Sequence, residues 1–316
     1  MIKALSLTGP TASGKTSLSL DIAEKFGLEI ISCDSMQIYR GMDIGTAKAT
    51  VEEQARVKHS LIDFLSPSEC YSAEAYRLDA MRASAEILGR GHTPFFVGGT
   101  GLYVDTLMRK EAAGSPPSDP ELRARLLALG PDELYARLLA VDAESAAAIH
   151  KNNVKRVVRA LEIFELTGKT KTAFDNESRL LTPDFLIKMV TLDFHNRENL
   201  YNRVNMRVDA MVKAGLIDEV EALWRAGLLK PEYTASSAIG YKEIVEYLEG
   251  KATLCEACEK IKLSSRRYAK RQLTWFRHVP DAVHLFVDNE DGEIKQYGEL
   301  LAEAEVVFAE LEREIK

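Results

Sequence analysis

An octapeptide near the N-terminus has the composition and spacing of a phosphate-binding loop. Residues 9–16, Gly-Pro-Thr-Ala-Ser-Gly-Lys-Thr, fit the pattern G-x-x-x-x-G-K-[ST], in which backbone N–H groups and a helix N-terminus surround phosphate oxygens. The lysine supplies positive charge to the outer phosphates, and the threonine hydroxyl suits Mg²⁺. The sequence therefore predicts a di- or triphosphate site with Mg²⁺ as cofactor. Its residues are Gly9, Pro10, Thr11, Ala12, Ser13, Gly14, Lys15 and Thr16.

Two other polar residues follow short apolar stretches that are typical of strands. Asp34 comes just after residues 28–32, and Thr100 follows the glycines that end residues 93–97. Ligands of open α/β proteins bind at the carboxyl ends of the strands, so we expect both side chains beside the phosphate loop. Asp34 would hold Mg²⁺, orient an acceptor hydroxyl or act as a general base. An aspartate that caps a turn is the structural alternative.

The phosphate loop by itself does not distinguish phosphoryl transfer, nucleotide hydrolysis and departure of a diphosphate. P-loop ATPases normally place a metal-binding aspartate after a further apolar strand. In this chain the run 95–97 ends in Gly98 and Gly99 instead, which weakens the ATPase interpretation. A small-molecule kinase that uses ATP and Mg²⁺, with Asp34 activating a hydroxyl, stays open.

The segments around these residues predict a parallel sheet. Residues 2–8 form an apolar, strand-like run, and residues 16–26 have helical spacing. Strand-like runs at 28–32 and 93–97 flank an amphipathic stretch that begins after Ser72. Alternating strands and helices indicate an α/β core with helices on both faces of the sheet.

The character of the sequence changes after Arg109. Residues 111–117 are rich in Ala, Gly, Ser and Pro and are typical of a linker. The following stretch to about Gly168 has helical periodicity only, and strand-like runs return at 185–192 and 282–287. We therefore expect a P-loop NTPase-like α/β core of residues 1–111 and 185–316, with an all-helical insertion domain at residues 112–184.

Composition limits the class of protein. The chain has 316 residues, of which 46% are hydrophobic and 28% charged, as in ordinary soluble globular proteins. No apolar run reaches the roughly 18 residues of a membrane-spanning helix, so we expect no membrane association and a cytoplasmic location. The four cysteines are too few for a disulfide scaffold, and the pair Cys255 and Cys258 lacks a second pair of zinc ligands.

Positive charge is concentrated in two segments, although the formal net charge is 41 − 48 = −7. Residues 260–277 contain seven Lys and Arg residues and no acid, and a second cluster lies in residues 151–159. A charged stretch is most often a solvated helix face, but such a run also suits RNA. Tyr268 and Trp275 share a helix face and would stack on unpaired bases; core packing is the alternative for Trp275.

Several motifs together resemble the tRNA dimethylallyltransferase family in its bacterial form, without the C-terminal zinc finger of many eukaryotic relatives. The similarity spans nearly the whole chain, including the helical insertion. Residues 149–153, Ile-His-Lys-Asn-Asn, depart from the His-Pro-Asn-Asp of the family. The matching segments are the phosphate loop, Asp34–Lys48, His59–Asp63, Val97–Tyr103, Asp119–Arg123, Lys155–Ile163, Ile239–Glu243 and Lys270–Arg277.

The resemblance implies transfer of a dimethylallyl group from dimethylallyl diphosphate to N6 of the adenosine 3′-adjacent to the anticodon in tRNA, with release of diphosphate. The phosphate loop would then bind a leaving group, which accounts for the missing second aspartate. Asp34 would accept the N6 proton, and Thr100 would bind the diphosphate near the breaking C–O bond. Arg203 and Arg207, one helical turn apart, would add charge against the diphosphate, and a solvated helix face is the alternative for them. The target base must leave the anticodon-loop stack to react.

The resemblance also gives the basic segments a use. The insertion is expected to hold the tRNA anticodon stem-loop, and the enzyme is expected to act as a monomer. Two alternatives from other classes are the ATP-dependent kinase and a non-catalytic RNA-binding protein, to which Lys15 and Asp34 would be superfluous. The expected tRNA-binding residues are Asp34, Ser35, Met36, Gln37, Thr100, Arg123, Lys155, Arg156, Val157, Val158, Arg159, Arg271 and Trp275.

Overall fold

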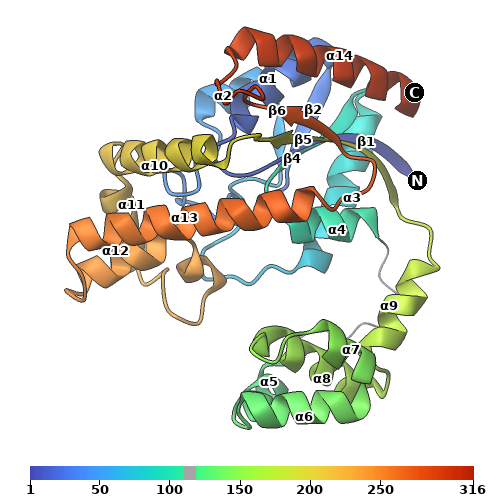
Figure 1. Cartoon of the computed structure of the whole chain (residues 1–316), viewed down its shortest axis with the longest axis vertical. Helices are drawn as coiled ribbons and strands as arrows, with labels where there is room; N and C mark the ends of the chain where they lie inside the picture. Colours follow the sequence, from blue (N-terminus) through green and yellow to red (C-terminus); the bar gives the residue numbers. More distant parts are fainter. Residues whose placement is uncertain (110–118) are drawn as a thin grey trace. The chain divides into compact units, whose positions relative to one another are not determined.

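A computed structural model describes residues 1–109 and 119–316 of the chain (Figure 1). It contains two compact units, one formed by Met1–Asp105 with Phe185–Lys316 and the other by Thr106–Asp184. The expected linker at residues 111–117 lies outside the described residues. The larger unit carries both the phosphate loop and Asp34.

The larger unit is built on a six-stranded sheet in the order β3-β2-β4-β1-β5-β6. Every neighbouring pair is parallel, so the predicted parallel α/β core is confirmed. The two-residue strand β3 was not expected, because so short a run has no periodicity to detect. The strands are β1 (Ile2–Thr8), β2 (Leu28–Ser32), β3 (His59–Ser60), β4 (Thr93–Gly98), β5 (Phe185–Asp193) and β6 (Val283–Phe286).

Helices cover both faces of the sheet. The connection that leads into β2 and the one that leads back from it run in opposite directions along the sheet. The chain passes from β1 through α1 to β2 and returns through α3 to β4, and right-handed crossovers place those helices on opposite faces. Phe95 of β4 packs edge-on against Phe308 of α14, which shares a hydrophobic cluster with α1. The helical elements are α1 (Lys15–Phe26), α2 (Val51–Arg56), α3 (Ala73–Gly89), α4 (Gly101–Met108), α10 (Arg197–Lys213), α11 (Leu216–Arg225), the 3₁₀ turn η1 (Thr234–Ser237), α12 (Tyr241–Leu248), α13 (Leu254–Phe276) and α14 (Tyr297–Ile315).

The smaller unit is helical throughout its described part, with a core of its own. Its first helix begins as expected: the Asp119 side chain accepts a hydrogen bond from the Leu122 N–H, and Pro120 occupies the first turn. Glu162 is fully buried and accepts hydrogen bonds from the guanidinium groups of Arg123 and Arg159. The helices are α5 (Pro120–Leu127), α6 (Pro131–Val141), α7 (Ala143–Ala148), α8 (Val154–Thr167) and α9 (Lys171–Arg179).

In the described part of the chain, none of the helices has the length and apolar character needed to cross a membrane.

Candidate active site

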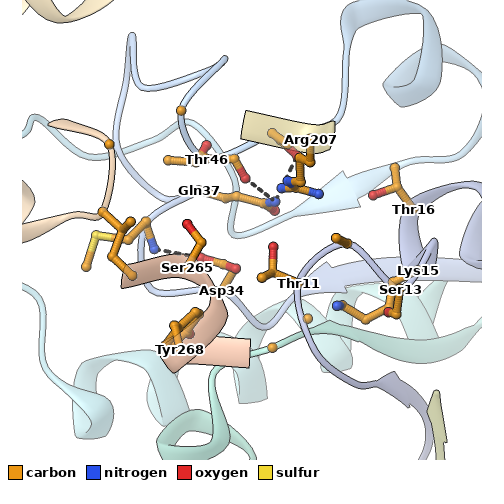
Figure 2. A pocket seen from close by; sticks show the side chains of 18 of the residues that line it. Thr11, Ser13, Lys15, Thr16, Asp34, Gln37, Thr46, Arg207, Ser265 and Tyr268 are labelled. Carbon is orange, nitrogen blue, oxygen red and sulfur yellow. Dashed lines mark hydrogen bonds between the residues drawn. The ribbon is translucent and has the colours of Figure 1, made fainter. Parts of the chain in front are cut away.

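A cavity of about 530 Å³ lies at the carboxyl edge of the sheet in the larger unit (Figure 2). The phosphate loop, the ends of β2 and β4, and helices α10 and α13 contribute its lining. Asp34, Lys15 and Arg207 all line it. The cavity therefore brings together residues that the sequence predicted separately.

The phosphate loop has backbone angles that its glycines allow. Gly9 has a φ of 137°, and a Cβ built there would lie 2.8 Å from the Leu192 carbonyl oxygen, so a side chain does not fit. Gly14 (φ 93°) precedes the first residue of α1, Lys15, so the helix N-terminus faces the cavity. The Arg203 Nε atom donates a hydrogen bond of 2.8 Å to the Ala12 carbonyl oxygen and fixes the loop from α10.

Lys15 lies inside this loop among polar atoms of the same chain. Its ammonium group donates hydrogen bonds to the carbonyl oxygens of Gly9 (2.9 Å) and Pro10 (2.7 Å). Burial and the nearby positive charge of Arg207 lower the pKa of Lys15 to about 7, against an opposing effect of Asp34. Burial also lowers the pKa of Arg207. The two cations thus have one nearby carboxylate, Asp34, between them, and an anionic ligand would supply further negative charge.

The lowered pKa of Lys15 can be tested by titration. We expect Lys15 to lose its proton near pH 7 in the free protein, and to keep it well above pH 7 when inorganic diphosphate is bound, because the anion favours the charged form. Affinity for diphosphate should accordingly fall as the pH rises above 7. The measurement is ¹³C NMR of the lysine Cε resonances, assigned with Lys15→Arg. Titration of Lys15 near its ordinary value of about 10.4 in the free protein would contradict the expectation.

Asp34 and Thr100 are brought together because β2 and β4 are neighbours. The Thr100 N–H donates to the Cys33 carbonyl oxygen (3.1 Å), and the Ser35 N–H donates to the Thr100 hydroxyl (3.0 Å). One oxygen of the Asp34 carboxylate accepts the Met36 N–H at 2.9 Å, and no hydrogen bond to its other oxygen occurs among the described residues. That oxygen is available to accept a proton from a ligand.

Tyr268 of α13 adds an aromatic side chain to the cavity beside Asp34. Burial and the neighbouring negative charge of Asp34 raise the pKa of Tyr268 above its ordinary value. The phenol therefore stays protonated and does not compete with Asp34 as a base near neutral pH. The Arg271 guanidinium lies 5.6 Å from the centre of the Tyr268 ring, within cation–π range.

Gln272 is a site residue that sequence reasoning missed. Its side chain is buried, accepts the Thr11 N–H at 2.9 Å and donates to the Gly99 carbonyl oxygen at 2.8 Å. It thereby joins the phosphate loop to the glycine turn that precedes Thr100. The segment Lys270–Arg277 contributed to the family resemblance, but an uncharged amide among cations gave no signal of this role.

Three of the seven cations in residues 260–277 form ion pairs, so the run that contains no acid in the sequence is partly neutralised in the structure. Lys260 pairs with Glu246 (3.0 Å), Lys262 with Asp209 (2.8 Å) and Arg277 with Asp193 (2.6 Å). The acids belong to other helices and to β5, so proximity along the sequence did not reveal them. The exposed cations of α13 without an ion pair among the described residues are Arg267, Lys270 and Arg271.

The predicted tRNA-binding residues have different environments in the structure. Val157 and Val158 are buried in the core of the smaller unit, so their side chains do not face solvent. Trp275 is half-buried and packs against Gly101, where a Cβ would lie 2.6 Å from the indole ring. Lys155 and Arg156 are exposed on α8. Arg123 and Arg159 share the buried Glu162 carboxylate.

Comparison with known proteins shows which sequences this chain is similar to. Residues 37–279 match the family described as IPP transferase, and residues 2–65 match isopentenyl transferase. The tRNA dimethylallyltransferase of Shouchella clausii is 46% identical over 295 residues, which cover 92% of this chain and 93% of that protein. The Bacillus velezensis enzyme is 47% identical over 277 residues, covering 86% and 87% of the two chains.

Solved structures extend the similarity to the fold. A tRNA isopentenylpyrophosphate transferase from Bacillus halodurans aligns with a TM-score of 0.74 and 40% identity, covering 100% of this chain and 98% of that one. A eukaryotic dimethylallyltransferase acting on tRNA aligns with a TM-score of 0.78 and 29% identity over 96% of this chain and 85% of its own. The sequence motifs, the parallel-sheet core and these relatives together show that this chain belongs to the tRNA dimethylallyltransferase family.

Proposed function

We propose that this chain transfers a dimethylallyl group from dimethylallyl diphosphate to the exocyclic N6 of the adenosine 3′-adjacent to the anticodon in tRNA. The observation that carries the proposal is that the phosphate loop and Asp34 line one cavity. A cation-rich end for a diphosphate and a carboxylate for a proton are what an N-alkylation with a diphosphate leaving group requires.

The reaction is a substitution at C1 of the donor. The C1–O bond breaks, and its electron pair leaves with the diphosphate, which Lys15, Arg207 and the loop N–H groups stabilise. The adenine nitrogen forms the new bond to C1 and gives its proton to Asp34. Thr100, whose hydroxyl lies beside the turn that carries Asp34, would hydrogen-bond the diphosphate near the breaking bond.

Mg²⁺ fits this site as a partner of the leaving group. Thr16 lines the cavity at the start of α1. Among the described residues, there is no cluster of three or more His, Cys, Asp or Glu side chains that would hold a metal by itself. Magnesium commonly binds through substrate phosphates, water and one or two protein oxygens. We propose that Thr16 and the diphosphate oxygens would hold the ion, which when bound would neutralise charge on the leaving group.

The test of this function separates it from the alternatives. The protein is incubated with Mg²⁺ and either labelled dimethylallyl diphosphate with bulk tRNA, or ATP with small hydroxyl acceptors. We expect label in tRNA, at the adenosine next to the anticodon after nuclease mapping. Formation of ADP instead would identify a kinase, and retarded tRNA without label would identify a binding protein. Sedimentation of the active species tests the proposed monomer.

The tRNA surface includes the exposed cations of α13, and salt dependence measures their contribution. We expect Arg271→Ala to weaken binding of all substrate tRNAs about equally, and to lower the log–log salt slope by roughly 0.7–0.9, because one phosphate contact is lost. The matched control is Lys260→Ala on the same helix, since Lys260 is already paired with Glu246. Equal slopes for the wild type and Arg271→Ala would place the RNA surface elsewhere.

A further inference from the structure

One wall of the cavity is a loop whose position depends on a carboxylate of another helix. Gly45, Thr46 and Ala47 line the cavity. The N–H groups of Asp43 (2.9 Å), Ile44 (2.7 Å) and Gly45 (3.0 Å) donate hydrogen bonds to the Glu219 carboxylate on α11. Three successive backbone donors on one carboxylate form an anion nest, so Glu219 fixes this loop as a unit.

Tyr241 holds the same carboxylate from the other side. Its hydroxyl donates a hydrogen bond of 2.5 Å to Glu219, and its ring lies so close to Gly45 that a Cβ there would be 2.5 Å from a ring carbon. Burial and the Glu219 charge raise the pKa of Tyr241, so the hydroxyl remains a donor. The contact excludes any larger residue at position 45 and sets how far the loop lies from α12.

The end of the loop is tied to the segment that carries Asp34. The Gln37 side-chain amide donates to the carbonyl oxygens of Thr46 (3.4 Å) and Ala47 (3.2 Å), and its oxygen accepts the Ser32 hydroxyl at 3.2 Å. The loop is therefore anchored at its start by Glu219 and at its end by Gln37, which lies beside Thr46 in Figure 2.

Part of the cavity lining beside this loop is apolar. Val208 and Met211 of α10 and Leu216 of α11 belong to it, and the Ile44 side chain packs near Gly215 at the junction of those helices. The five-carbon tail is the only apolar part of the donor, and apolar lining is what such a group requires. Because Ile44 belongs to the loop that Glu219 holds, a shift of the loop would change the space beside these apolar side chains.

We propose that Glu219, held by Tyr241, is a positioning residue that fixes the loop 43–47 and thereby sets both the affinity for the dimethylallyl tail and the discrimination against longer prenyl chains. This inference rests on the proposed function. Glu219 is not among the residues that line the cavity; it acts through the three N–H groups it binds.

The experiment compares Glu219→Gln with Glu221→Gln. The second variant makes the same change on the same helix, at a carboxylate whose ion pair among the described residues is with the surface residue Arg225. We expect Glu219→Gln to raise KM for dimethylallyl diphosphate by about tenfold or more with kcat within about threefold. Affinity for inorganic diphosphate should change less than about twofold, because the phosphate loop is untouched. The preference for dimethylallyl over geranyl diphosphate should narrow by about tenfold.

A second variant and a direct readout keep the proposal testable if Glu219→Gln is poorly folded. Tyr241→Phe keeps the ring and removes the hydroxyl, so we expect the same pattern at about threefold in KM. Hydrogen–deuterium exchange of the amides at positions 43–45 should accelerate in both variants and not in Glu221→Gln. Faster exchange with unchanged KM and donor preference would overturn the proposal, as would an equal loss of inorganic diphosphate affinity.

Failure of the proposed function looks different from failure of this inference. A wild-type protein that transfers no prenyl group to tRNA would contradict both the proposed function and the role of Glu219. Normal wild-type transfer with a Glu219→Gln variant that matches Glu221→Gln in every measurement removes only the role of Glu219.

Discussion

Asp34→Asn is expected to reduce the single-turnover rate of prenyl transfer by about 10²–10⁴-fold, the usual contribution of a general base. The exocyclic N6 of adenine is a poor nucleophile because its lone pair is conjugated with the ring, so removal of its proton matters. Asparagine keeps an oxygen that accepts the Met36 N–H, and the turn should therefore persist. Affinity for tRNA and melting temperature should change little, which separates a chemical defect from a folding defect.

An Asp34→Asn variant that transferred the group at nearly the wild-type rate would eliminate Asp34 as the base. Neither neighbouring group is a ready substitute. Burial raises the pKa of Tyr268, and this effect persists when the Asp34 charge is removed, so its phenolate is scarce at neutral pH. Lys15 has a pKa lowered to about 7 in the free protein, but the bound diphosphate would keep it protonated during the reaction.

Lys15→Ala is expected to produce the second large loss of prenyl-transfer rate. It weakens stabilisation of the leaving group and does not affect the nucleophile. Removing one positive contact to a developing anion costs roughly 2.7–4 kcal/mol of transition-state stabilisation, or about 10²–10³-fold in rate. The loss should appear in kcat for dimethylallyl transfer and in the affinity for inorganic diphosphate. Binding of tRNA should be nearly unchanged, because Lys15 lies within the phosphate loop.

The matched control is Lys25→Ala, which removes a lysine from the other end of the same helix, where it pairs with Glu305 on the surface. That variant should keep the wild-type rate. Loss of tRNA binding by a well-folded Lys15→Ala protein would show that the phosphate loop and the RNA surface are not separate, contrary to the proposed division of roles.

The sequence by itself determined the local features of this protein. The glycines and lysine of residues 9–16 define the phosphate loop, since only that combination provides the backbone angles, N–H groups and charge at one helix start. Alternating strands and helices predicted the parallel sheet, and Asp34 and Thr100 at strand ends were expected at one edge. These inferences succeed because they depend on residues close in the sequence and on a general rule of α/β folds.

Only the tertiary structure decided which charges are free and which polar residues join distant segments. Arg277 belongs to the apparently unopposed basic run, yet it pairs with Asp193, which is 84 positions away. Gln272 bridges the phosphate loop and the Gly99 turn, and Glu219 holds a loop more than 170 positions before it. An ion pair or a bridging amide has no sequence period, because its partner is chosen by how strands and helices pack. The sheet order and the packing of α10 to α13 therefore determine which side chains remain for substrate.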